Sequence, residues 1–306
     1  MTELSQMILQ SYQTRKTKKQ KERFLQVVCA HLDKHNIPYQ IDVQGKLLKS
    51  KNLIVGNLEN PKVVCTAHYD TQAVMPIPNF ITPFSWTGII IFNLILLGII
   101  YLVAILLETL FCLWDPVFFE GSYGLFWWIA FLYIYFGIPN PHTANDNTSG
   151  VIVLLELIQS LDSYDDVCFV FFDLEEVGLV GSKRFEKKHY VSIKNATVIN
   201  YDCISDGNTF YLKLSHDQDG FYETAKEVFT PVTGKEVLIT TKGFYPTDAM
   251  HFMTSISCAA LRKRKNLLYL SRIHTLRDTI FETKNIEWFK DKTLQYIKKK
   301  KGDETI

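Results

Sequence analysis

The chain lacks an excess of charge of either sign. It has 33 lysine and arginine residues against 32 aspartate and glutamate residues, and its sequence pI is near 7.6. A protein that gathers nucleic acid along the phosphate backbone usually presents a strong positive field, which this composition does not provide. We therefore expect no nucleic-acid partner.

The chain also lacks closely spaced cysteines. Its six cysteines form no C-x-x-C pair, and most of them lie in apolar runs, where a reduced thiol behaves as a small hydrophobe. The first residues contain no uninterrupted apolar segment followed by a small-residue cleavage site, so a secretory signal peptide is not expected. These features predict that the water-soluble part of the chain lies in the cytoplasm.

Charge is missing from the whole stretch between Phe84 and Leu107, which is longer than the roughly 20 residues needed to cross a bilayer core. A second apolar run, Gly124 to Ile138, is shorter, and it spans only if it starts near Pro116 or lies in a thinned bilayer. The stretch between the two runs contains acidic groups and turn-forming residues, Asp115-Pro116 and Glu120-Gly121. Together the runs predict a hydrophobic helical hairpin with an acidic tip.

Lysine and arginine are absent between Lys62 and Lys183 but frequent on both sides of this stretch. The positive-inside bias then puts both flanks in the cytoplasm, so we expect a two-span membrane protein that contacts the lipid bilayer through its hairpin. Two alternatives stay open at this point: a buried helical pair inside a soluble core, and a hydrophobic lid on the membrane surface. Tryptophans near the ends of the runs would lie at the headgroup level: Trp86, Trp114, Trp127 and Trp128.

The rest of the chain alternates apolar strands with amphipathic helices. This alternation predicts a three-layer α/β/α fold with a mostly parallel mixed central sheet, into which the hairpin is inserted. We expect residues 1–74 to form the first part of the catalytic domain, 75–140 the transmembrane hairpin, and 141–306 the second part. The segments behind this prediction are a helix from about Thr17 to His35, a helix from about Ser149 to Leu161, strands at Lys62–His68, Asp166–Leu174, Ala196–Ile204 and Ile256–Leu261, and a terminal helix at Asn285–Lys301.

Side chains able to bind metal or move protons follow these strands. In parallel sheets, such residues meet outside the carboxyl ends of the strands. Imidazole and carboxylate groups without nearby cysteine suit zinc, and a carboxylate that bridges two ions is the usual construction of a two-metal hydrolytic site. Any one of them could be a turn or cap residue, so the hypothesis depends on the set: His68, Asp70, Asp146, Glu175, Glu176, Asp202 and His274.

The local motifs around these residues resemble those of a known family, the co-catalytic two-zinc aminopeptidases of clan MH, of the leucyl aminopeptidase and aminopeptidase Y type. The resemblance covers nearly the whole chain except residues 75–139. It implies a metallopeptidase with a peptide substrate and two zinc ions. The matching motifs are His68-Tyr69-Asp70-Thr71, Asn145-Asp146-Asn147 with Ser149-Gly150, Glu175-Glu176, Asp202, and His274-Thr275 with Asp278-Thr279.

The resemblance also implies a role for each residue. His68 and Asp202 would hold one zinc, Glu176 and His274 the other, and Asp146 would bridge both. Glu175 would be the general base, and Asp70 would orient His68 by accepting its second imidazole N–H. The peptide after the bridging aspartate is cis in the family, so the same is expected of Asp146-Asn147. Thr247-Asp248 is similar to a supporting element of the family, although Asp248 could equally be a helix N-cap.

One feature departs from the family: a hydrophobic hairpin lies between His68 and Asp146, where soluble members have a short loop. We therefore expect the active site to face the bilayer and to receive membrane-proximal or hydrophobic peptides.

Other functions stay open, because related enzymes include carboxypeptidases and a glutaminyl cyclase that uses one metal on a similar scaffold. A non-catalytic peptide-binding module does not account for the intact ligand set. A small transporter or channel subunit does not fit a chain with at most two spans and only Asn93 as an internal polar group. The basic run Arg262–Lys265 could contact a substrate carboxylate, although an exposed strand end is the simpler reading.

Overall fold

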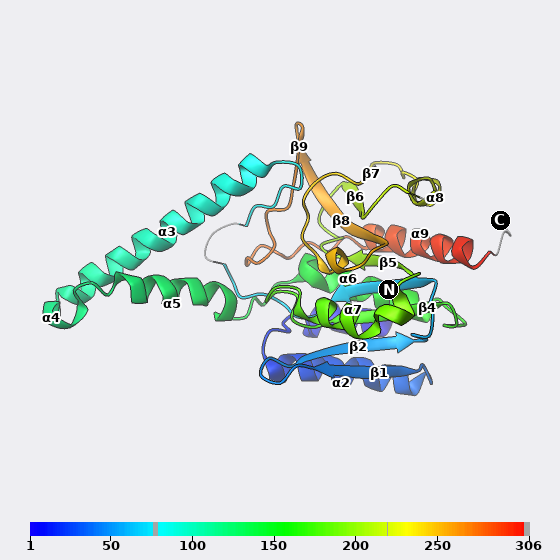
Figure 1. The fold of residues 1–306 in the computed structure, drawn as a ribbon, viewed down its shortest axis with the longest axis horizontal. Coiled ribbons are helices and arrows are strands. Elements are labelled where there is room, and N and C mark those ends of the chain that lie inside the picture. Colours follow the sequence, from blue (N-terminus) through cyan, green and yellow to red (C-terminus); the bar gives the residue numbers. More distant parts are fainter. Residues whose placement is uncertain (76–78, 219, 303–306) are drawn as a thin grey trace.

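The computed structural model describes residues 1–75, 79–218 and 220–302, so residues 76–78 of the predicted insertion and 303–306 of the last predicted part lie outside it. Figure 1 shows the arrangement of the elements. In chain order they are α1 (Glu3–Ser11), α2 (Lys18–Lys34), β1 (Tyr39–Gln44), β2 (Ser50–Gly56), β3 (Val63–His68), α3 (Trp86–Cys112), α4 (Pro116–Phe119), α5 (Tyr123–Phe136), η1 (Ala144–Thr148), α6 (Ser149–Gln159), β4 (Val167–Phe172), α7 (Val180–Ile193), β5 (Thr197–Tyr201), β6 (Thr209–Leu214), α8 (Phe221–Val228), β7 (Glu236–Thr240), η2 (Asp248–His251), β8 (Ser255–Arg264), β9 (Leu267–Tyr269) and α9 (Thr283–Lys301).

The strands form one mixed sheet in the order β1-β2-β4-β3-β5-β8-β6-β7, with β9 paired to β8. The neighbours β4, β3, β5 and β8 at its centre run parallel, as do β6 and β7. The pairings β1-β2, β2-β4, β6-β8 and β8-β9 are antiparallel. The predicted mixed sheet is confirmed, and its parallel centre gathers the carboxyl ends of β3, β4 and β5 at one edge.

Helices cover both faces of this sheet, which confirms the three-layer fold. Alternate residues of β4 divide between two hydrophobic clusters, because successive side chains of a strand point to opposite faces. Phe169 and Phe171 join the larger cluster with residues of α1, α2, α6 and α9. Cys168 and Val170 join the second cluster, which includes Phe185 of α7. The central strands are therefore buried on both sides, as their continuous apolar sequences indicate.

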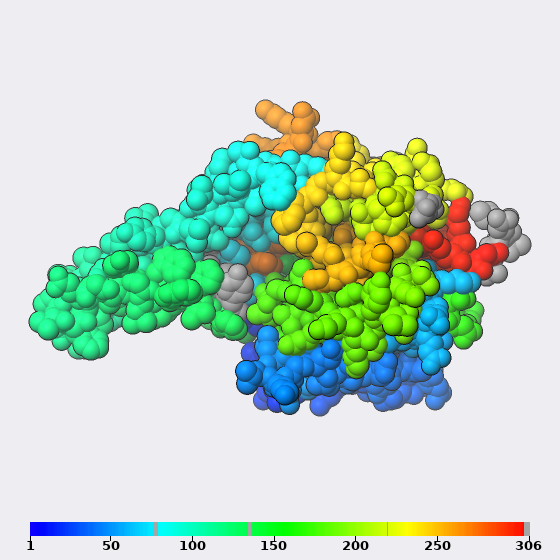
Figure 2. Space-filling model, viewed as in Figure 1, coloured from blue at the N-terminus to red at the C-terminus, as the bar shows by residue number. Residues whose placement is uncertain are grey.

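The predicted hairpin leaves this domain as two apolar helices, α3 and α5, joined through the short α4 (Figure 1). Helix α3 has 27 residues, and it is long and apolar enough to cross a membrane. Its apolar side chains face outward, with only Ile100 and Ala104 buried, so a buried helical pair inside a soluble core does not fit. In the space-filling view the hairpin protrudes from the rest of the molecule, and only its base lies against the α/β domain (Figure 2).

Helix α5 has 14 residues and is therefore shorter than the roughly 20 that a full crossing needs. The sequence run begins earlier, but α4 and a turn at Gly121, where φ is 79°, break it before Tyr123. The segment that enters α3 is fixed to the α/β domain. Ile81 pairs with Leu270 in a β-bridge, and the Trp86 ring lies 4.7 Å from that of Phe244.

Two predicted helix starts can be compared with the structure. Helix α2 begins with a capping box in which Thr17 and Gln20 each accept a backbone N–H of the other. At α6, whose predicted start is about Ser149, the N-terminal contact comes from a residue before the N-cap. Thr148 makes no side-chain cap hydrogen bond, and instead Asn147 Oδ1 accepts the N–H of Gly150 at 3.0 Å.

Candidate active site

Three of the predicted site segments follow neighbouring parallel strands. His68 is the last residue of β3, Glu175 and Glu176 follow β4, and Asp202 follows β5. Strand β3 lies between the other two in parallel register, so all three segments emerge at the same edge of the sheet. Because the carboxyl ends of parallel strands meet there, residues far apart in the sequence come together.

Two residues outside the sheet complete the cluster: Asp146 of η1, and His274 of the segment between β9 and α9. Asp146 Oδ1 lies 3.4 Å from His68 Nε2, and Asp146 Oδ2 lies 2.8 Å from His274 Nε2. Asp202 Oδ1 is 3.8 Å from His68 Nε2, and Glu176 Oε2 is 3.3 Å from His274 Nε2. The structure thus brings all five predicted ligands into one cluster, with one Asp146 oxygen toward each histidine.

The backbone around Asp146 is held by polar contacts from several segments. The Asp146-Asn147 peptide is cis, as expected from the resemblance. The buried carboxylate of Asp278 accepts the N–H groups of Asn145 at 2.8 Å and Asp146 at 3.0 Å. Asn147 donates from Nδ2 to the carbonyl of Tyr201 at 2.8 Å, which ties the segment to the end of β5.

Asp70 contacts its neighbours differently from the expectation. His68 Nδ1 is 3.0 Å from the main-chain oxygen of Asp70 and 3.8 Å from its Oδ1, so the closer partner is the backbone. The Asp70 carboxylate instead accepts the N–H groups of Glu175 at 3.0 Å and Glu176 at 3.2 Å. Asp70 therefore links the end of β3 to the segment that holds both glutamates.

The donor set fits divalent metal. Two ligand atoms that each lie about 2.1 Å from one tetrahedral ion are roughly 3.4 Å apart, and the four distances above lie around this value. Three overlapping groups have ligand atoms within 4.8 Å of one another: His68, Glu175 and Asp202; His68, Asp146 and Glu176; and Asp146, Asp202 and Cys203. The buried Cys203 thiol therefore lies beside two of the carboxylates, and the expectation of a cluster without nearby cysteine is wrong. In addition, Glu176 Oε1 is buried without a hydrogen-bond partner, as a carboxylate oxygen oriented toward a cation would be.

The imidazoles and carboxylates of the cluster shift one another's pKa values. Burial works to lower the pKa of both histidines, but the neighbouring carboxylates outweigh it. They raise the pKa of His68 well above its ordinary value and that of His274 to about 9. Burial also raises the pKa of Glu176 to about 8, although His274 opposes this. The same carboxylates that attract protons here would attract a divalent cation, which competes with protons for these ligands.

Two residues near the cluster were missed by sequence reasoning. Arg15 is fully buried, donates from Nε to the carbonyl of Tyr69 at 2.6 Å, and has its pKa lowered to about 9 by burial. Asn79 Nδ2 lies 3.2 Å from Nδ1 of His274, on the segment that leads into α3. Neither residue belongs to a recognisable motif. Arg15 reaches Tyr69 and Asn79 reaches His274 across long stretches of sequence, so no local pattern indicates them.

Two further predictions concern residues beside the cluster. Asp248 is fully buried and opens η2, while Thr247 occupies the N-cap position, so Asp248 is not the cap. The basic run Arg262–Lys265 lies at the end of β8, where β8 pairs with β9, as predicted for a strand end. Arg262 pairs with Asp206 at 3.0 Å, which gives this arginine a structural partner.

Comparison with known proteins agrees with this arrangement. The model of peptidase family M28 matches residues 129–297, which include all predicted ligands except His68. No curated protein matches the chain. The LapA aminopeptidase of Legionella pneumophila aligns with a TM-score of 0.59 at 12% identity, over 96% of this chain and 67% of LapA. A glutaminyl cyclase of Porphyromonas gingivalis aligns with a TM-score of 0.59 at 16% identity, over 97% of this chain and 99% of the cyclase. At these identities, the likeness to solved structures shows the fold alone.

Proposed function

The chain belongs to peptidase family M28, and from this membership we propose that it is a membrane-anchored aminopeptidase that uses two zinc ions. Membership makes it a metallopeptidase, a hydrolase of peptide bonds. The observation that supports a two-metal site is the position of Asp146, whose two carboxylate oxygens face different histidines. A carboxylate placed in this way can bridge two cations.

In this proposal, one zinc is held by His68 and Asp202, the other by His274 and Glu176, and both by Asp146. The donors are imidazole nitrogens and carboxylate oxygens, which zinc accepts readily. When bound, the two cations supply Lewis-acid chemistry that polarises the scissile carbonyl and makes water nucleophilic near neutral pH. The protein must then place a base beside the reacting water.

Glu175 is that base in the proposal. It lies in the same cluster as His68 and Asp202, and burial raises its pKa well above the ordinary value, against the opposing charge of His68. A carboxylate with a raised pKa can accept the proton of water and return it to the leaving amine. Asp70 is a positioning residue, because its carboxylate holds the N–H of Glu175. The products are a carboxylic acid and an amine, with water consumed.

The membrane part of the proposal is that α3 and α5 enter the bilayer together from the cytoplasmic side. Both ends of the insertion return to one catalytic domain, so the number of complete crossings must be even. The absence of lysine and arginine between Lys62 and Lys183 favours a cytoplasmic location for both flanks. Because α5 is short, the bilayer must thin beside it or the domain must lie close against the membrane surface.

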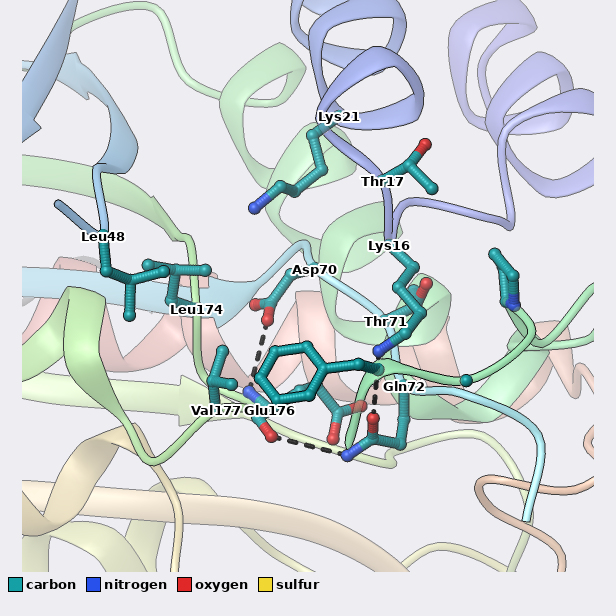
Figure 3. A pocket seen from close by; sticks show the side chains of 13 residues that line it. Lys16, Thr17, Lys21, Leu48, Asp70, Thr71, Gln72, Leu174, Glu176 and Val177 are labelled. Carbon is teal, nitrogen blue, oxygen red and sulfur yellow. Dashed lines mark hydrogen bonds between the residues drawn. The ribbon is translucent and has the colours of Figure 1, made fainter. Parts of the chain in front are cut away.

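The substrates proposed are hydrophobic or membrane-proximal peptides. A cavity of about 270 Å³ lies beside the cluster, and Asp70 and Glu176 form part of its wall (Figure 3). Much of its remaining wall is apolar and comes partly from the end of α5. Lys21 of α2 and Lys16 of the loop before α2 also line the cavity (Figure 3). A peptide side chain released from the lipid surface would meet this cavity next to the proposed metal ligands. The apolar wall includes Leu48, Phe136, Pro139, Leu174 and Val177.

Metal analysis of the detergent-purified chain, paired with release of amino acids from a peptide library, tests the catalytic proposal. We expect two equivalents of zinc and free N-terminal amino acids. Acetylation of the peptide N-terminus should abolish release, whereas amidation of the C-terminus should not. Fewer than one equivalent of zinc, cobalt or manganese would contradict the proposal. The membrane delivery is tested in vesicles, where equal activity on soluble and lipid-anchored peptides would remove its basis.

A second candidate is a glutaminyl cyclase, because the Porphyromonas gingivalis cyclase matches the fold as well as LapA does. The bridging position of Asp146 favours the peptidase, since a single metal needs no bridge. The same purified protein distinguishes the two activities. A cyclase would release ammonia from peptides that begin with glutamine, leave the peptide bond intact, and contain one equivalent of metal.

A further inference from the structure

The turn between β1 and β2 exposes apolar side chains next to lysines. It comprises residues 45–49, with the sequence Gly-Lys-Leu-Leu-Lys. Leu47 is 102% exposed and Leu48 46% exposed, while Lys46 and Lys49 on either side are exposed as well. Exposure of a leucine side chain to water is unfavourable. Its free energy would fall if the tip of the β1–β2 turn contacted another apolar phase.

This exposure belongs to a well-held turn. Gly45 has a φ of 93°, and a Cβ at this position would lie 2.4 Å from the carbonyl oxygen of Leu48. A glycine is therefore required for the chain to turn so tightly. Arg184 of α7 donates from one guanidinium nitrogen to the carbonyls of Gln44 at 3.1 Å and Leu48 at 2.7 Å, and to Ser50 Oγ at 3.2 Å. Arg184 therefore holds the backbone of the turn against α7, and the Leu47 side chain remains exposed to solvent.

The turn lies beside the base of the hydrophobic hairpin. Leu48 lines the same cavity as Phe136 and Gly137, which end α5. In the ribbon view, the turn also points toward the side of the molecule from which α3 and α5 extend (Figure 1). A membrane that receives the hairpin would therefore pass close to the turn.

The unequal lengths of α3 and α5 bring this side of the domain nearest to the membrane. At 1.5 Å per residue, the 27 residues of α3 extend about 40 Å, whereas the 14 residues of α5 extend about 21 Å. The hydrocarbon core is about 30 Å thick. Because the two helices meet at α4, the base of α5 is drawn further toward the bilayer than the base of α3. The turn beside α5 then lies at the headgroup level.

We propose that residues 45–49 form a second membrane contact, in which Leu47 inserts among the headgroups and Lys46 and Lys49 bind the phosphates of anionic phospholipids. This inference rests on the proposed membrane anchor. Leucine between two lysines matches an anionic interface, because the apolar side chain enters the acyl boundary while the ammonium groups stay at the negative surface. The contact would hold the cavity beside Glu176 open toward the lipid surface.

The test uses the full chain in vesicles, with Cys112 replaced by serine so that the remaining native cysteines are buried. A spin label is attached to Leu47→Cys, to Leu102→Cys on the hairpin, or to the exposed Val191→Cys on α7. Vesicles contain phosphatidylcholine alone or an equal mixture with phosphatidylglycerol. Electron paramagnetic resonance then measures the access of oxygen, which enters lipid, and of a nickel chelate, which stays in water.

We expect the label at 102 to be immersed in both lipids, the label at 47 to be immersed mainly in the anionic mixture, and the label at 191 to stay aqueous. Replacing both lysines with glutamine should lower the ratio of immersed to aqueous label at 47 by about tenfold or more. If the label at 102 is immersed while that at 47 stays aqueous, the second contact is wrong and the anchor stands. Equal immersion of the label at 47 in both lipids overturns the role of the lysines. An aqueous label at 102 contradicts the anchor itself.

Discussion

The cluster of proposed metal ligands and the hydrophobic hairpin place their side chains in opposite ways. In the cluster, charged groups are buried: His68 is 1% exposed and Asp146 5%. In the hairpin, apolar groups are exposed: Leu102 is 66% exposed and Val117 94%. A charge is stable inside a protein only if other charges or hydrogen bonds compensate it, and an apolar surface is stable outside only if the surroundings are apolar.

With the proposed membrane anchor, this comparison means that one chain is folded for two surroundings. The cluster has compensating groups in place, such as the Asp278 carboxylate that accepts two backbone N–H groups next to Asp146. The hairpin has few polar groups to compensate, and some of them bond within their own helix, as Asn93 does when it donates to the carbonyl of Ile89. Substitutions in the cluster should therefore change metal binding or chemistry, and substitutions in the hairpin should change membrane insertion. Each of the following predictions tests that separation.

The largest effect is expected from Asp146→Asn. Loss of the bridging carboxylate removes a ligand shared by both proposed ions, so metal content should fall below one equivalent and peptide hydrolysis should disappear. Metal analysis and peptide release measure both, and Asp165→Asn on an exposed loop is the control. Flotation with vesicles should be unchanged, because the hairpin does not depend on the metal. A variant that loses flotation along with its metal would mean that the two regions are not separable.

Glu175→Gln should lower kcat by about 10²- to 10⁴-fold, the usual contribution of a general base, while zinc content stays almost unchanged. Glu176→Gln is the matched control, because the neighbouring residue is a proposed ligand and its loss should reduce metal content as well. Steady-state kinetics and metal analysis on the same preparations separate the two roles. Equal loss of metal in both variants would contradict the assignment of Glu175 as the base.

Leu102→Lys should impair membrane insertion by about 2.5–3.5 kcal/mol, because a charge at the centre of a spanning helix must leave water. The matched control is Val191→Lys on α7, whose side chain is exposed on the catalytic domain and where a charge should cost under about 0.5 kcal/mol. Resistance to carbonate extraction, compared between the variants, measures the difference. Similar behaviour of the two variants would show that the hairpin surface is not in lipid.

The smallest effect is expected from Asn79→Ala, which acts where the two regions meet. A ligand histidine needs a hydrogen-bond partner on the ring nitrogen that faces away from the metal, and Asn79 lies 3.2 Å from that nitrogen of His274. With Nε2 bound to metal, Nδ1 carries the hydrogen and donates it, so the Asn79 amide would be turned to accept through Oδ1. Zinc affinity, measured by competition with a chelator, should fall about 10- to 100-fold. Asn93→Ala in α3 removes the same amide away from the site and should leave affinity unchanged.

Much of the fold could be predicted from the sequence because its signals are local. The strand ending at His68 and the strand before Glu175 are continuous apolar runs, and the predicted bounds lie within two residues of β3 and β4. The start of α2 at Thr17 follows from capping chemistry that is complete within four residues. The length of the second hydrophobic helix was less predictable, since a turn at Gly121 interrupts a run that hydropathy alone treats as continuous.

By itself, the sequence determined the alternation of strands and helices, the hydrophobic insertion, and the identity of the residues able to bind metal, because each depends on side chains close together in the chain. Only the tertiary structure decided which groups meet. It gave one Asp146 oxygen to each histidine, turned the Asp70 carboxylate toward the backbone of Glu175, and brought Asn79 and Arg15 to the cluster. These contacts join segments separated by long stretches of chain, and their geometry depends on how a parallel sheet, its loops and the hairpin base pack together.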